Sequence, residues 1–126
     1  MIHLDTNILV GITTLDPSVT DAVIKQVRKG EQFAISAIVW YEFLSGPVSD
    51  AELDHIRSAI APEVLPFDRL NAEVAAALFN VCGRARKLKI DTLIAQCALD
   101  ADCALMTANE KDFARFVPFG LKLLTP

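Results

Sequence analysis

The chain has 126 residues, of which 52% are hydrophobic and 22% are charged, and its formal net charge is −4. This composition excludes an intrinsically disordered chain and favours a globular fold with a substantial core. The length predicts a single domain over residues 1–126, and a chain of this size buries roughly two thirds of its unfolded surface on folding. The negative charge argues against a protein whose whole surface binds nucleic acid.

The longest apolar segments, such as Phe33–Tyr41, fall short of the roughly 20 residues that cross a bilayer, so we expect no membrane association. Asp5 interrupts the first apolar run, and we therefore expect a cytoplasmic protein without a signal peptide. The cysteines, Cys82, Cys97 and Cys103, form no CxxC pair and are far in sequence from His3 and His55. This spacing predicts neither a disulfide nor a structural zinc site.

Short β-like runs alternate with longer helical patterns along the chain. The predicted strands are Met1–Leu4, Gln32–Ser36, Val64–Phe67, Cys103–Thr107 and Leu121–Leu124. Helices are predicted over Thr20–Lys29, after Ser49, from Asp68, and from Asp91 onward. This alternation predicts the α/β class, with a mostly parallel sheet sandwiched by helices and ligands bound at the carboxyl ends of the strands.

Two of the predicted helices have clear sequence signals. Ser49 followed by Asp50 and Glu52 is typical of an N-cap with an acidic first turn. The helix from Asp68 carries an apolar stripe at helical spacing, which predicts a buried face. The stripe consists of Leu70, Val74, Leu78, Val81, Ala85 and Leu88. Gly83 interrupts it and marks either a kink or an end, so the basic residues that follow are in a helix or a loop.

Acidic residues recur where apolar runs end or helices begin, at Asp5, Glu42, Asp91 and Asp112. Each has a structural interpretation when taken alone, because Asp5 and Asp91 could cap helices and Asp112 lies in a polar turn. Glu42 is harder to explain in this way, since it lies between apolar residues in a segment that looks largely buried. A buried carboxylate pairs, coordinates a metal or takes up a proton.

Parallel topology could bring the four acids to one edge of the sheet. Two carboxylates about 4 Å apart repel each other by roughly 4 kcal/mol at an effective dielectric constant near 20. A hard divalent cation such as Mg²⁺ or Mn²⁺ would offset this repulsion. Such ions activate water in phosphodiester hydrolysis, and the sequence offers no convincing nucleophile–base pair instead.

Four segments in order, LDTNILV, ISAIVWYEFLSG, IDTLIAQCAL and ALMTANEKDFARF, resemble the PIN-domain ribonucleases, and most closely the VapC-type toxins of toxin–antitoxin pairs. The resemblance runs nearly from end to end. It implies a three-layer α/β/α sandwich, dependence on Mg²⁺ or Mn²⁺, RNA as substrate, an antitoxin protein as partner and a homodimer. It assigns the catalytic and metal-binding positions to Asp5, Glu42, Asp91 and Asp112.

The resemblance also assigns supporting roles to polar neighbours of the acids, namely Thr6, Asn7, Thr107 and Asn109. Position 109 can be acidic in relatives, and the Asn at this position favours one tightly held ion. The segment RARKLKI runs straight into Asp91, where relatives often have a glycine-bearing loop. This difference affects substrate access and leaves the substrate preference open.

A basic cluster lies just upstream of Asp91 and consists of Arg84, Arg86, Lys87 and Lys89. These residues are candidates for holding RNA phosphates, with a solvated helix face as the equal alternative. Trp40 and Tyr41 favour a core or dimer-interface role over base stacking.

The leading hypothesis is therefore a metal-dependent endoribonuclease whose products carry 5′-phosphates. A phosphohydrolase of the phosphoaspartate type is the first alternative, and the Asn at position 7 counts against it because those enzymes open with DxD. A non-catalytic binding module is the second, and the presence of all four acids counts against it.

Overall fold

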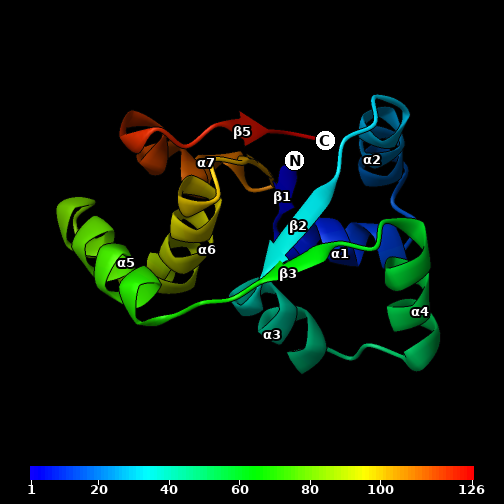
Figure 1. The fold of residues 1–126 in the computed structure, drawn as a ribbon, viewed down its shortest axis with the longest axis horizontal. Helices are drawn as coiled ribbons and strands as arrows, with labels where there is room; N and C mark the ends of the chain where they lie inside the picture. The colour runs from blue at the N-terminus through cyan, green and yellow to red at the C-terminus, as the bar shows by residue number, and fades with distance from the viewer.

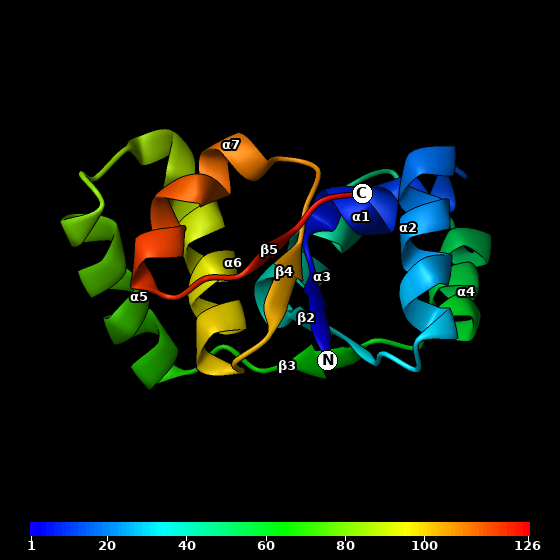
Figure 2. The same ribbon diagram turned by 90° about the horizontal axis from the view of Figure 1, so that it is seen from above.

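The computed structural model describes residues 1–126, which form a five-stranded parallel sheet between two groups of helices. Figures 1 and 2 show α1, α2 and α4 on one side of the sheet and α5, α6 and α7 on the other. The strands are β1 (Ile2–Leu4), β2 (Phe33–Ser36), β3 (Glu63–Leu65), β4 (Ala104–Met106) and β5 (Leu123–Leu124). The predicted α/β fold with helices on both faces of a parallel sheet is confirmed.

Seven α-helices and two 3₁₀ helices connect the strands. The α-helices are α1 (Thr6–Thr13), α2 (Pro17–Arg28), α3 (Ala37–Ser45), α4 (Asp50–Ala59), α5 (Arg69–Val81), α6 (Lys89–Asp100) and α7 (Glu110–Phe113). The 3₁₀ helices are η1 (Arg86–Leu88) and η2 (Ala114–Phe119). None of the helices combines the length and apolar character needed to span a bilayer.

The strand order β3-β2-β1-β4-β5 places β1 at the centre of the sheet. All four strand pairs are parallel, and Ile2 lies opposite Phe33 on β2 and Ala104 on β4. The residues of β1 and β2 are buried throughout, as expected for inner strands covered on both faces. This arrangement brings the residues that follow β1, β2 and β4 to the same edge.

Helix caps form largely where the sequence predicts them. Ser49 caps α4 in a reciprocal arrangement with Glu52, and Asp68 caps α5 in the same way with Asn71. The predicted helix over Thr20–Lys29 begins three residues earlier, because Asp16 caps α2 and Pro17 occupies its first turn. Asp91 lies in the first turn of α6 rather than at its start, since the helix begins at Lys89.

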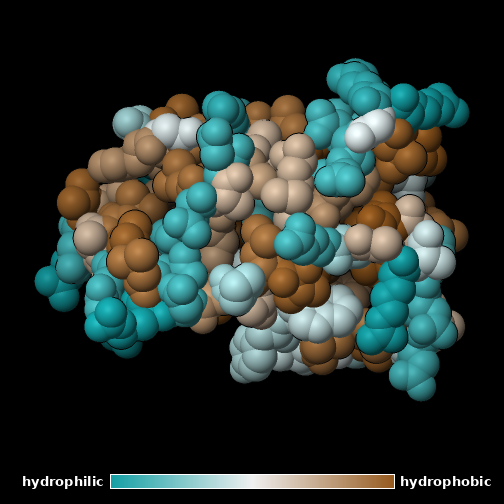
Figure 3. All heavy atoms as spheres, viewed as in Figure 1, coloured by the Kyte–Doolittle hydropathy of each residue, from teal (hydrophilic) through white to brown (hydrophobic).

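The predicted buried face of α5 is wrong. Leu70, Val74 and Val81 are 62%, 47% and 68% exposed, while Leu78 alone of the stripe within α5 is buried. The helix instead turns Asn71, Ala75 and Leu78 inward, because the small Ala75 permits close packing against α6. Hydrophobic side chains are accordingly visible on the surface at the end of the molecule that α5 occupies (Figure 3).

Gly83 ends α5 rather than bending it. Its φ of +93° lies in the left-handed region that glycine adopts without strain. Ala85 and Leu88 therefore lie outside the helix, and the basic cluster occupies a loop, η1 and the start of α6. The alternative between helix and loop is thus resolved in favour of a short irregular connection.

Candidate active site

The carboxylate of Asp5 lies at the end of β1, where it caps α1 and is only 5% exposed. One oxygen accepts a hydrogen bond from the backbone N–H of Thr6 at 2.7 Å. The other accepts from the Asn7 amide and the Thr107 hydroxyl, both at 2.7 Å. These donors offset the cost of burying a carboxylate and hold its oxygens in one orientation.

Glu42 projects from α3 and is half-buried, with one carboxylate oxygen accepting a hydrogen bond from the Thr6 hydroxyl at 2.6 Å. Thr6 therefore connects Asp5 and Glu42, using its backbone for one and its side chain for the other. The segment around Glu42 is less buried than its apolar sequence predicts. Val39 and Phe43 face inward, while Tyr41 is 70% exposed, because a helix covered on one side buries only one stripe.

The other two acids come from helices beyond the sheet edge. Asp91 lies in the first turn of α6 and Asp112 in α7, and both are half-buried. The Asn109 amide donates to one oxygen of Asp112 at 2.9 Å, and the ammonium of Lys87 lies 3.8 Å from the other. Asp112 thus has two partners, whereas Asp91 has no hydrogen-bond or ion-pair partner.

The four acids act on one another electrostatically. The pKa of Asp91 is raised to about 6, first by burial and then by the negative charges of Asp5, Asp112 and Glu42, against the opposing charge of Lys87. Burial also raises the pKa of Asp5, with its hydrogen bonds opposing and Glu42 adding to the shift. The pKa of Asp112 is lowered, first by the Asn109 hydrogen bond and then by nearby cations. The four carboxylates therefore lie near enough for the charges of the other three to affect Asp91, and we call the region that they surround the acidic pocket.

The supporting polar residues tie this pocket together across the chain. Thr107 is fully buried, and its hydroxyl accepts hydrogen bonds from the Asn109 backbone at 2.9 Å and the Asn7 amide at 3.3 Å. The side-chain Oδ1 of Asn7 in turn accepts a hydrogen bond from the backbone N–H of Ala108 at 3.0 Å. These contacts join the loop after β4 to the start of α1, so the positions of Asp5 and Asp112 are coupled.

The donor set of the pocket fits a hard divalent cation, because it consists of carboxylate oxygens whose mutual repulsion a cation would offset. The side chains as they lie form no group of three or more His, Cys, Asp or Glu that could hold a metal ion. Coordination of such an ion would therefore require the acidic side chains to rotate toward one another.

The basic cluster does not act as one unit. Lys87 is the member that reaches the acids, while the Lys89 ammonium lies 5.9 Å from the centre of the Phe79 ring, a cation–π contact. Arg84 and Arg86 are exposed. Sequence reasoning missed a further basic residue, Arg115, whose charge lowers the pKa of Asp112. Its position three residues after Asp112, about one helical turn, was the available signal.

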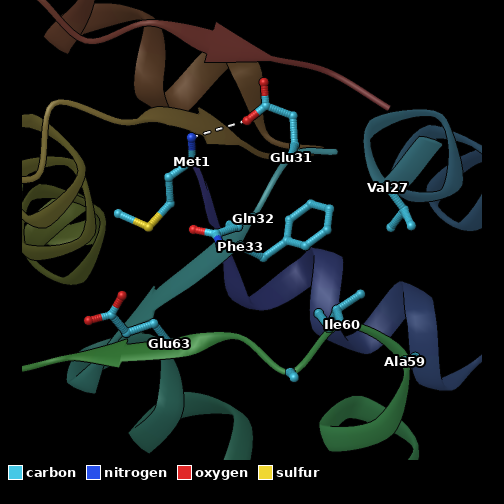
Figure 4. Close-up of a pocket in the computed structure, with 9 residues that line it drawn as sticks. Met1, Val27, Glu31, Gln32, Phe33, Ala59, Ile60 and Glu63 are labelled. Atoms are coloured by element: carbon cyan, nitrogen blue, oxygen red, sulfur yellow. Dashed lines mark hydrogen bonds and ion pairs between the residues drawn. The ribbon is translucent and has the colours of Figure 1, made fainter. Parts of the chain in front are cut away.

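One pocket of the molecule lies well away from these acids. It has a volume of about 350 Å³ and is lined at the opposite end of the sheet by residues that begin or precede the strands, including Met1, Phe33 and Glu63 (Figure 4). The amino group of Met1 pairs there with Glu31 at 3.1 Å. None of the four acids lines this pocket, so we do not place the active site in it.

The fold and the acidic pocket define an α/β domain with a polar site at the carboxyl edge of its parallel sheet. The family model described as PIN domain matches residues 2–117. The chain therefore belongs to the PIN domain family. No curated protein matches it.

Similar solved structures include a toxin–antitoxin complex from Klebsiella pneumoniae, with 29% identity over 90% of this chain and 91% of that one, and a TM-score of 0.68. VapBC2 from Rickettsia felis bound to a promoter DNA fragment has 23% identity over 100% and 99% of the two chains, and a TM-score of 0.72. VapBC-1 from nontypeable Haemophilus influenzae has 21% identity over 99% and 98%, and a TM-score of 0.72. The family match confirms the predicted resemblance to PIN domains, and these neighbours share the fold.

Proposed function

We propose that residues 1–126 form a single metal-dependent endoribonuclease domain, the toxin of a toxin–antitoxin pair. The observation that carries this proposal is the match of residues 2–117 to the PIN domain family. Four carboxylates from separate elements, three of which affect the fourth by their charge, support it. A pocket that concentrates negative charge in this way is costly unless a cation occupies it.

Asp5, Glu42, Asp91 and Asp112 would hold Mg²⁺ or Mn²⁺ in this proposal. When bound, such an ion activates water and stabilises the negative charge that develops on a phosphodiester. The hydrogen bonds from Thr6, Asn7 and Thr107 orient Asp5 and oppose the rise in its pKa, while the Asn109 hydrogen bond orients Asp112 and lowers its pKa. No side chain is needed as a nucleophile, and hydrolysis leaves a 5′-phosphate on the downstream fragment.

RNA is the substrate that we propose, and the basic cluster would contact its phosphates. Arg84, Arg86 and Lys87 lie within eight residues of Asp91 and are exposed. Phosphate contacts position a nucleic acid without reading its sequence. The cluster therefore accounts for binding beside the acidic pocket and not for base preference.

Cleavage of total RNA by the purified protein tests the proposal. Wild type, Asp5→Asn and the control Asp54→Asn are each incubated with Mg²⁺, Mn²⁺ or EDTA; Asp54 is an exposed residue of α4 paired only with Arg57. We expect discrete fragments with 5′-phosphates from wild type and Asp54→Asn, and none with EDTA or from Asp5→Asn. Folded wild type that cleaves no RNA with either metal would contradict the proposal.

We further propose an antitoxin protein as partner, because the similar structures include toxin–antitoxin complexes. A charged segment of the antitoxin would inhibit the nuclease at either the acidic pocket or the basic cluster. A Lys or Arg of the partner can neutralise the acids, or an acidic segment can cover the cluster. Co-purification of the chain with the product of the adjoining gene, and loss of RNA cleavage in the complex, would test this.

The exposed stripe of α5 supports a homodimer. Leu70, Val74 and Val81 are spaced four and seven residues apart along one side of the helix and are all exposed. Two copies would pair through this side of α5, beside which the helix carries the opposite charges of Arg69 and Glu73. Apolar seams flanked by complementary charge are typical of helix–helix interfaces.

A further inference from the structure

Lys87 differs from the other residues of the basic cluster in where its charge lies. Its ammonium is 3.8 Å from Oδ1 of Asp112, in the acidic pocket. The ammonium of Lys89, two residues along, lies over the Phe79 ring instead. Arg86 forms no ion pair with any carboxylate. The one cation of the cluster placed among the acids is therefore Lys87.

The positive charge of Lys87 acts on two acids from different helices. It lowers the pKa of Asp112 on α7 and opposes the upward shift in the pKa of Asp91 on α6. Lys87 lies in η1, which runs directly into α6, four residues before Asp91. The single ammonium of Lys87 therefore offsets part of the electrostatic repulsion among the carboxylates.

The contact between Lys87 and Asp112 is easily exchanged. The Lys87 side chain is 72% exposed, and no hydrogen bond accompanies the ion pair. An exposed pair of this kind contributes little to stability, because water screens it and the long side chain stays flexible. The other oxygen of Asp112 is held by Asn109 at 2.9 Å, so Asp112 keeps its place when Lys87 leaves.

We propose that Lys87 is a tethered counter-ion of the acidic pocket, which a divalent cation displaces and which then binds a phosphate of the RNA substrate. This inference rests on the proposed function and specifies how its site responds to the metal. A divalent cation brings twice the charge to the same carboxylates and repels the ammonium. The side chain remains attached at the edge of the pocket, where the substrate backbone enters.

Two effects of opposite sign follow for Lys87→Ala. Removal of a competing positive charge strengthens metal binding, while removal of a phosphate contact weakens RNA binding. A residue that merely supports the fold would weaken both. An ordinary phosphate-binding residue would weaken RNA binding whether or not a metal is present.

Calorimetric titration of Mg²⁺ into the full chain without RNA measures the first effect. We expect the Kd of Lys87→Ala to be about threefold to tenfold lower than that of wild type at low salt. Lys89→Ala is the matched control and should keep the wild-type Kd, since its charge lies over Phe79. Lys87→Arg, which keeps the charge, should bind Mg²⁺ as wild type does.

Fluorescence anisotropy with a labelled single-stranded RNA measures the second effect, in EDTA and in Ca²⁺, which binds oxygen ligands as Mg²⁺ does. Lys87→Ala should lose more affinity in Ca²⁺ than in EDTA, where Asp112 competes with the phosphate for the ammonium. Arg86→Ala, whose guanidinium has no carboxylate partner, should lose affinity by the same factor under both conditions.

The outcomes separate this inference from the proposed function. Equal Mg²⁺ affinities for wild type and Lys87→Ala would overturn the counter-ion role while leaving the metal site intact. Equal losses of RNA affinity with and without Ca²⁺ would overturn the displacement. Wild type that binds no Mg²⁺ at all would overturn the metal-dependent function together with this inference.

Discussion

At the scale of single residues, the half-buried Asp91 and the fully buried His3 both carry an unfavourable electrostatic free energy, for different reasons. Asp91 is held among three other carboxylates, and its pKa is raised to about 6. His3 is fully buried in β1, and neither ring nitrogen has a hydrogen-bond partner. The cost at Asp91 arises in the proposed active site, whereas the structure gives His3 no role.

Asp91→Asn is expected to stabilise the metal-free protein at pH 7. The pKa of Asp91 rises from 3.8 to about 6 on folding, so the folded state binds more protons than the unfolded state between these values, and stability falls as the pH rises through this window. Because Asp91 is half exposed, we expect a gain on the order of 1 kcal/mol. Urea unfolding at pH 4 and pH 7 measures it, and a gain that is equal at both pH values would contradict this cause.

His3→Leu is expected to stabilise the protein by about 1–3 kcal/mol, because it removes buried polar atoms without partners. Burial lowers the pKa of His3 from 6.5 to about 4, with the Leu4 backbone opposing the shift. The unfolded state therefore binds more protons between these pH values, and wild type loses stability as the pH falls through them. The gain should thus be larger at pH 5 than at pH 7.5 in thermal unfolding. No gain at either pH would mean that the imidazole finds a partner in solution.

At the scale of elements, the sequence predicts best where the signal is local. Short apolar runs predict the strands, and Ser49 predicts the start of α4 because its cap uses residues three positions apart. The prediction for α5 is wrong because packing against α6, which sequence periodicity does not contain, buries Ala75 and leaves Val74 exposed. The positions of the acids at the ends of elements identify them in the sequence, whereas the contacts of Thr6 with Asp5 and Glu42 depend on how α1 and α3 pack.

The packing of α1 against α2 depends on Gly11. A Cβ atom added there would lie 2.6 Å from Cγ2 of Val19. Gly11→Ala is therefore expected to lower the free energy of unfolding by about 1–3 kcal/mol through overpacking. Denaturant unfolding measures this loss, and the double variant Gly11→Ala/Val19→Ala should recover part of it. A double variant that only adds the two losses would show that the clash relaxes elsewhere.

The outer stripe of α5 is expected to control association. Val74→Asp places a charge in the centre of the proposed dimer interface, where it would be desolvated without a partner. We expect wild type to sediment as a dimer at equilibrium and Val74→Asp to sediment as a monomer at micromolar concentration, with the far-UV spectrum unchanged. Glu110→Gln, on the exposed side of α7, is the control. A monomeric wild type would contradict the homodimer itself.

At the scale of the whole molecule, metal binding should be visible as stability. A ligand that binds only the folded state stabilises it by about 2.7 kcal/mol at a hundredfold excess over its Kd. We expect Mg²⁺ to raise the melting temperature of wild type at constant ionic strength, and Asp5→Asn to abolish this shift. An equal shift in both proteins would assign the effect to ions outside the acidic pocket.

The hydrogen bond between Asp5 and Thr107 joins positions 102 residues apart. During synthesis the first of the four acids leaves the ribosome long before the loop after β4 exists. The nascent chain therefore carries an incomplete pocket until almost the entire domain has emerged. For a nuclease whose proposed substrate is RNA, this order of assembly delays activity until the acidic residues of the domain are all in place.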